Sequence, residues 1–168
     1  HSSPSSLTDF GKKLLDKDPN NPGSLGIAIS DAIESVIKSE GKAKYSLGSV
    51  LGHVLMHQTI NGNEAILQME QAGDYPDIIV GCTGGGSNLS GLMFPFLGQQ
   101  LRGGPKIDII GCEPLSCPSF TKGIYAYDHG DMARMTPLIK MHTLGSDFLP
   151  PANHSGGLRY HGMSYHLS

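Results

Sequence analysis

Three consecutive glycines followed by a serine and an asparagine are the residues of this sequence best suited to bind a ligand: Gly84, Gly85, Gly86, Ser87 and Asn88. They stand between "IIVGCT", which is typical of a buried strand, and "LSGLMFPFL", whose apolar spacing favours a helix. Glycine lets backbone amides approach a ligand without a Cβ in the way, and the free N–H groups at a helix N-terminus favour an anion. The pattern therefore predicts a phosphate-binding loop.

Three other interpretations compete with this one. A tight turn alone usually needs only one glycine. The Walker pattern of nucleoside triphosphatases needs a lysine soon after its glycines, and the first basic residue after Gly86 is Arg102. The dinucleotide fingerprint would need a third glycine where Leu89 stands, although Glu113 is placed to bind a ribose hydroxyl unless it is an ordinary loop carboxylate. The structural turn and the dinucleotide site stay open.

The elements around the loop predict its surroundings. Residues 76–83 and 106–113 both have the composition of buried strands, and 88–101 is expected to be a helix that Pro95 bends or shortens. A strand, a helix and a second strand within about 40 residues indicate a βαβ unit. The predicted fold class is α/β, with a parallel sheet between helices in a three-layer arrangement.

The rest of the chain is less regular in pattern. Helices are expected over 7–15, over 24–37 with Ser24 as cap, and over 63–72, while the first half of 44–59 is left open between strand and helix. Residues 1–6 ("HSSPSS") are interpreted as a tag remnant or an artificial chain boundary, which leaves 7–168 as the folded part. Residues 114–168 carry many Gly, Pro, His and Met residues and are expected to be an irregular segment that needs a partner.

Composition excludes several classes of protein. The net charge is -3, and the cations gather only at Lys12, Lys13 and Lys17, which argues against nucleic-acid binding. No apolar run reaches the roughly 20 residues that span a bilayer, so we expect no membrane contact and a cytoplasmic location. Two of the three cysteines lie in strand-like runs, which suits reduced thiols in a core.

Several motifs in order resemble the β chain of tryptophan synthase, a fold-type II pyridoxal 5′-phosphate enzyme. They are "SLGIAISDAIE", "YSLGSVLGHVLMHQT", "CTGGGSN", "GLMFPFL", "IIGCEP" and "SGGLRYHG", and together they extend over nearly the whole chain. The stretches "HVLMHQT" and "GLRYHG" look more like the divergent second type of β chain than the type that pairs tightly with an α subunit.

The resemblance implies specific roles. The five residues Gly84 to Asn88 would hold the cofactor phosphate, mostly through backbone N–H groups. Carbonyl oxygens of Gly84, Tyr160 and Gly162 would bind a monovalent cation, K⁺ or Na⁺. The parent enzyme would make L-tryptophan from indole and L-serine, as a homodimer and with a tryptophan synthase α chain as an implied partner. Arg159 stands where the common type has an acidic residue, so substrate closure would differ.

The family's catalytic residues, a Schiff-base lysine and a glutamate in a glycine-rich segment, lie outside the matched motifs. No lysine of this chain follows a histidine with an asparagine two places later, which is the context of the family's Schiff-base lysine. We therefore expect a central fragment that grips a phosphate and is inactive alone, because such cofactors work through an imine with lysine. The alternatives are another fold-type II lyase or synthase, and a non-catalytic phosphate- or nucleotide-binding domain. A zinc site at His53 and His57 is a weaker hypothesis.

Overall fold

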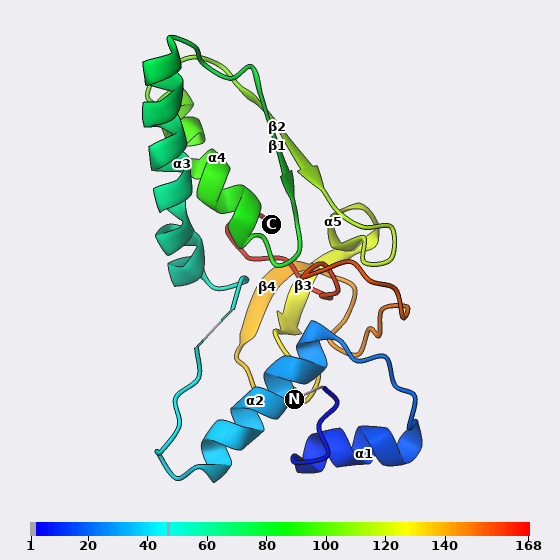
Figure 1. Ribbon diagram of the computed structural model, residues 1–168. Helices are drawn as coiled ribbons and strands as arrows, with labels where there is room; N and C mark the ends of the chain where they lie inside the picture. The colour runs from blue at the N-terminus through cyan, green and yellow to red at the C-terminus, as the bar shows by residue number, and fades with distance from the viewer. Residues whose placement is uncertain (1–2, 47) are drawn as a thin grey trace.

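The helices and strands form two groups in the computed structural model, which describes residues 3–46 and 48–168 (Figure 1). The first group holds α3 (Gly52–Ala72), β1 (Ile78–Cys82), α4 (Ser87–Leu101) and β2 (Asp108–Cys112). The second group holds α1 (Asp9–Lys17), α2 (Leu25–Lys38), α5 (Ser119–Lys122), β3 (Ile124–His129) and β4 (Leu138–Thr143).

The first group contains the predicted βαβ unit. Strands β1 and β2 pair in parallel, from Ile78 beside Asp108 to Cys82 beside Cys112, with α4 as the connection. Figure 1 shows α3 and α4 together on one side of the two strands. The core between them consists of five buried residues: Ile79, Leu89, Met93, Phe96 and Ile107. The prediction of mixed helix and strand with a parallel sheet is confirmed.

The opposite face of this sheet is bare. Ile78, Val80 and Ile110 are 53%, 58% and 47% exposed, because the helices of the described residues cover only one side. The three-layer arrangement is therefore not confirmed. Cys82 and Cys112 lie exposed on the two strands, so the expectation that these thiols are in a core is wrong.

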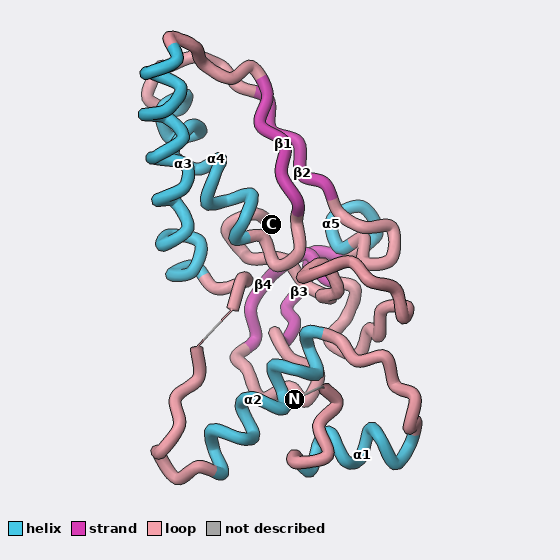
Figure 2. The backbone as a smooth tube through the Cα atoms, viewed as in Figure 1, coloured by secondary structure: helices cyan, strands magenta, loops and turns pink. Residues whose placement is uncertain are grey.

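The second group corrects the expectation of an irregular segment over 114–168. Strands β3 and β4 form an antiparallel hairpin that pairs Ile124 with Thr143 and His129 with Leu138 (Figure 2). The intervening turn holds Pro137 directly before β4, where proline does not remove a ladder hydrogen bond. Aromatic and β-branched residues in "IYAYDH" and "LIKMHT" favour these strands, although glycine and proline dominate the surrounding composition.

The helices differ from prediction mainly in their ends. Helix α3 begins at Gly52 rather than at residue 63, and Gly62 within it packs against α4. A Cβ at Gly62 would collide with the backbone oxygens of Gly91 and Leu92 on α4. Helix α4 continues through Pro95 to its end. Residues 44–46 and 48–51 precede α3 without helix or strand, and Leu47 lies outside the described residues.

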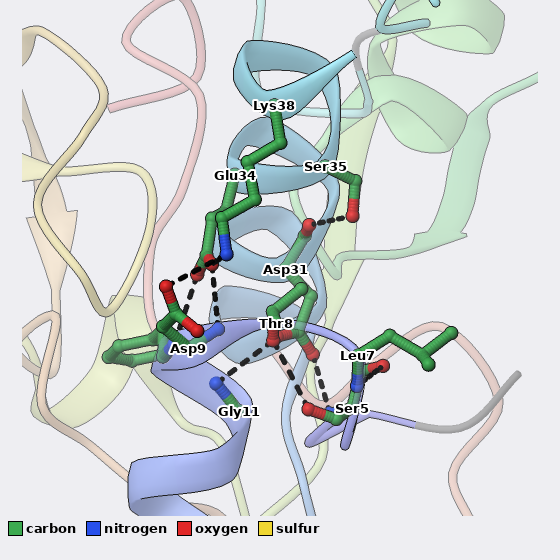
Figure 3. A network of polar contacts seen from close by, with 10 residues as sticks. Ser5, Leu7, Thr8, Asp9, Gly11, Asp31, Glu34, Ser35 and Lys38 are labelled. Atoms are coloured by element: carbon green, nitrogen blue, oxygen red, sulfur yellow. Dashed lines mark hydrogen bonds and ion pairs between the residues drawn. The ribbon is translucent and has the colours of Figure 1, made fainter.

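Polar contacts join α1 to α2 (Figure 3). The hydroxyl of Thr8 caps α1 and donates to Asp31 at 2.5 Å, and the backbone N–H of Ser5 donates to the same carboxylate at 3.0 Å. Glu34 accepts from the amides of Asp9 and Phe10, at 2.6 and 3.0 Å. The opening segment thus packs against α2. In the described part of the chain, no helix has the length and apolar character needed to cross a membrane.

Candidate phosphate-binding site

The five predicted loop residues line one pocket of about 270 Å³ at the carboxyl end of β1. Gly86 is the N-cap of α4 and has a φ of 111°, a conformation that side chains rarely adopt. No side chain caps the first turn of α4. The amides of that turn thus face the loop without a side-chain acceptor, which together with the helix dipole favours a bound anion.

Each glycine is in close contact with another segment of the chain. A Cβ on Gly84 would lie 2.8 Å from the carbonyl oxygen of Gly157, and a Cβ on Gly86 would lie 2.7 Å from a methyl carbon of Leu167. A Cβ on Gly85 would collide with the hydroxyl of Ser49. The contacts of Gly84 and Gly85 and the positive φ of Gly86 all favour glycine, so one turn residue alone does not account for the loop.

Ser49 was not singled out from the sequence. It contacts Gly85 and contributes to the lining of the loop pocket, together with Leu158 from the "GLRY" stretch. The only local signal is its place in "YSLGSV", upstream of a histidine-rich helix. The hydrogen bond from the Ser164 amide to the Gly85 carbonyl, 2.9 Å long, fixes the C-terminal segment against the same loop.

A second cavity, of about 450 Å³, adjoins the loop pocket through Ser49, which lines both. Its walls are almost entirely apolar. Helix α2 contributes Leu25 and Ile29, and β4 contributes Ile139 and Met141. This volume lies within the range of small-molecule sites. Sequence reasoning missed this cavity, because its walls come from four separate parts of the chain.

Three buried titratable groups lie around the apolar cavity. Burial raises the pKa of Tyr160, whose hydroxyl donates to the Gly130 carbonyl at 2.6 Å. Burial also lowers the pKa of His161, whose Nε2 lies 2.8 Å from the carbonyl oxygen of His129. Burial alone would raise the pKa of Asp131, but hydrogen bonds from Thr136 and Ser30 outweigh it and lower that pKa. All three groups hold backbone or side-chain partners in place.

The residues implied for a monovalent cation come from two adjoining segments. Gly84 lies in the loop, and the segment that contains Tyr160 and Gly162 runs past it to the Ser164 contact. Gly162 is bridged to Thr143 at the end of β4. The cation set itself stays a prediction.

Other candidate residues have structural partners. Glu113 accepts hydrogen bonds from the Phe120 amide and from the amide and hydroxyl of Thr121, so it caps α5. The Glu113 carboxylate is therefore already engaged, whereas the dinucleotide interpretation needs it to bind a ribose hydroxyl. Arg159 donates to three carbonyl oxygens, those of Pro22, Gly23 and Pro150.

Metal and lysine chemistry have no visible basis in these pockets. His53 and His57 are both exposed on α3, and among residues 3–46 and 48–168 no three His, Cys, Asp or Glu side chains meet in a metal-binding arrangement. No lysine is among the described residues that line the loop pocket or the apolar cavity. The site can hold an anion beside an apolar group, and it offers no amine nucleophile.

A glycine loop between a parallel strand and a helix N-terminus is typical of α/β proteins that bind phosphate groups. No family model matches the chain. It is 58% identical over 166 residues to the tryptophan synthase beta chain 2 of Aeropyrum pernix, covering 99% of this chain and 37% of that protein. It is 57% identical over 162 residues to that of Methanothermobacter thermautotrophicus and 58% identical over 162 residues to that of Thermotoga maritima, covering 96% of this chain and 38% of each relative.

The predicted resemblance to tryptophan synthase β chains, and to their second type, is therefore confirmed. The chain spans little more than a third of the length of these curated relatives.

Proposed function

We propose that this chain forms the phosphate-binding part of a pyridoxal 5′-phosphate enzyme that makes L-tryptophan from indole and L-serine by β-replacement. The observation that carries the proposal is the glycine loop at the N-terminus of α4, in a chain 54–58% identical to tryptophan synthase beta chains over nearly its whole length. The cofactor, when bound, withdraws carbanion electrons from the substrate, and the protein positions it.

The residues of the loop fit the cofactor phosphate. Backbone amides of Gly84, Gly85 and Gly86 would hold its oxygens, and Ser87 and Asn88 would add polar side-chain groups. Without a Cβ at these three positions, the loop packs closely against Gly157, Ser49 and Leu167. The carbonyl oxygens of Gly84, Tyr160 and Gly162 would bind the monovalent cation next to this loop.

The apolar cavity is the proposed compartment for indole. It has room for a bicyclic aromatic molecule, and its walls present almost no polar surface that would hold water. Ser49 borders both sites, so an indole in the cavity would lie next to a cofactor held by the loop. Exclusion of water would protect the reacting carbon from hydrolysis.

The remaining parts of the enzyme would come from the longer protein. We propose that the Schiff-base lysine and the catalytic glutamate lie there, so that the 168-residue chain binds without catalysis. The bare face of the parallel sheet supports a further layer that completes the three-layer fold. Homodimer formation, pairing with an α chain and a cytoplasmic location belong to the same proposal.

Binding of a phosphorylated vitamer tests the proposal directly. Pyridoxine 5′-phosphate lacks the aldehyde that would react with surface lysines, so calorimetry with the purified chain reports on the loop. We expect binding that unphosphorylated pyridoxine does not show. Gly86→Ala should weaken it about tenfold or more, because the residue needs a positive φ. Gly73→Ala, also at positive φ but with nothing within 4 Å, is the matched control.

Two outcomes would contradict the proposal. Equal binding of pyridoxine with and without phosphate would remove the loop from the site. Tighter binding of a nucleotide than of pyridoxine 5′-phosphate would favour the alternative of a nucleotide-binding domain. A separate assay with indole, L-serine and pyridoxal 5′-phosphate should give no tryptophan above the background of the free cofactor.

A further inference from the structure

Asp131 is a fully buried carboxylate that the proposed function does not use. Its side chain is 0% exposed. It accepts from the backbone N–H of Thr136 at 2.9 Å, from the hydroxyl of Thr136 at 2.8 Å and from the hydroxyl of Ser30 at 2.8 Å. A buried charge is costly unless such donors surround it. A network of this kind therefore holds its members in one arrangement.

The network joins two elements that are far apart in the sequence. Asp131 lies in the turn between β3 and β4, and Ser30 lies on α2, 101 positions earlier. The Ser30 oxygen also accepts from the amide of Ala133 at 2.9 Å, and the Met132 amide donates to the Gly26 carbonyl at 3.2 Å. The first turns of α2 are thus bonded to the hairpin turn, whereas the far end of α2 carries Ile37, which is 67% exposed.

These two elements are also two walls of the apolar cavity. Ile29, the neighbour of Ser30 on α2, lines the cavity from one side. Gly130 and Thr136, which flank Asp131 in the turn, line it from another. The carboxylate therefore lies where these two walls meet, and its hydrogen bonds connect them.

We propose that Asp131 is a positioning residue that fixes the spacing between α2 and the hairpin turn, and thereby the affinity of the apolar cavity for an aromatic ligand. The identity of that ligand as indole rests on the proposed function. The spacing itself rests on the contacts of Asp131, Ser30 and Thr136.

Fluorescence of the ligand gives a direct measurement, because the chain contains no tryptophan. Indole is titrated with the full 168-residue chain and with Asp131→Asn, whose amide group cannot accept from all the donors. We expect Asp131→Asn to weaken indole binding about tenfold, which corresponds to one or two lost hydrogen bonds. Asp147→Asn removes the same charge from a 73% exposed side chain paired with Arg134 and should stay within about twofold.

A second variant separates positioning from simple stability. Ser30→Ala removes one hydroxyl from the same network and should weaken indole binding in the same direction. In the double variant the two losses should not multiply, because both act through one contact. A folded Asp131→Asn that binds indole as tightly as the unaltered chain would overturn the inference. If Asp131→Asn fails to fold, unchanged affinity in Ser30→Ala would overturn it.

Xenon distinguishes failure of this inference from failure of the proposed function. If the unaltered chain binds no indole, the proposed indole compartment is contradicted. The spacing is then read from the chemical shift of xenon in the cavity, since that shift depends on cavity size whatever the natural ligand is. We expect the shift to differ between the unaltered chain and Ser30→Ala, and identical shifts would overturn the role of the network.

Discussion

The two sheets are held in place by different kinds of contact. The parallel pair β1–β2 rests on apolar side chains on one face, centred on Phe96, and leaves its other face bare. The hairpin β3–β4 is held by buried polar groups, with Asp131 and Tyr160 bonded to the turn or to α2. Apolar side chains pack without specific hydrogen-bond partners, so the exposed face of the β1–β2 sheet can accept a further layer. The buried polar groups around the β3–β4 turn, in contrast, find their hydrogen-bond partners within this chain.

The largest expected effect is a loss of stability in the group that contains the parallel sheet. Phe96 is 2% exposed and packs edge-on against Tyr75, with ring centroids 5.7 Å apart. Phe96→Ala should lower the free energy of unfolding by about 3–5 kcal/mol, because it leaves a cavity in the apolar core between the parallel sheet and α4. Urea unfolding measures the change. Leu101→Ala, on the same helix but 77% exposed, should change stability by less than about 0.5 kcal/mol. Equal losses in the two variants would contradict the one-faced core.

A smaller loss of stability is expected when one oxygen atom is removed beside the β3–β4 turn. Tyr160→Phe removes the hydroxyl that donates to Gly130 and keeps the ring, which is 2% exposed. The loss should be about 1–3 kcal/mol, since a buried carbonyl is left without its partner. Tyr127→Phe, at a ring 69% exposed on β3, is the matched control for the same chemical change. A Tyr160→Phe chain as stable as the unaltered one would mean that packing, and not hydrogen bonding, holds the hairpin turn.

A third effect tests how α2 is attached. The hydroxyl of Ser24 accepts from the Ile27 amide at 3.2 Å and caps the helix end that borders the apolar cavity. Ser24→Ala should cost about 1 kcal/mol, and Ser24→Asp should retain most of the stability because aspartate also caps. Thermal unfolding of both variants gives the comparison. A Ser24→Ala chain as stable as the unaltered one would show that the cap contributes nothing beyond the contacts of Gly26 and Ser30.

Local patterns predicted the parts of the fold that depend on neighbouring residues. The glycine loop, the Ser24 cap and the βαβ connection all follow from residues within one short stretch, so the sequence indicates them directly. The exposure of Ile78 and Val80 was not predictable, because the composition of a strand does not reveal which of its faces another element covers. Gly62 shows the same limit, since the sequence does not reveal that it packs against α4.

The apolar cavity and its polar frame were beyond sequence reasoning for a related reason. The contact between Ser30 and Asp131 spans 101 positions, and neither residue belongs to a recognisable motif. Ser49 and Gly85 are in contact although α3 and β1 separate them in the sequence. Long-range polar pairs leave no periodic signal, whereas apolar faces do. The β3–β4 hairpin and its hydrogen bonds to α2 were accordingly the part of the fold that the sequence predicted least well.

The smallest expected effect is a pH dependence of stability that arises from Glu34 on α2. Burial alone would raise the pKa of Glu34, but hydrogen bonds from Lys38 and from the amides of Asp9 and Phe10 lower it to about 2. A carboxylate whose pKa is lower in the folded chain stabilises the fold at pH values above its ordinary pKa of 4.5. That contribution is lost as the pH falls from there through about 2.

Glu34→Gln removes this contribution, so the difference in unfolding midpoint between the unaltered chain and Glu34→Gln should shrink as the pH falls from 4.5 towards 2. Other carboxylates titrate in the same range, and taking the difference cancels them. Glu70→Gln, an exposed position on α3, should show no such trend. A difference that stays constant with pH would mean that α1 is held to α2 by the Thr8 and Asp31 contacts alone. The charge of Glu34 would then be irrelevant to the docking of α1.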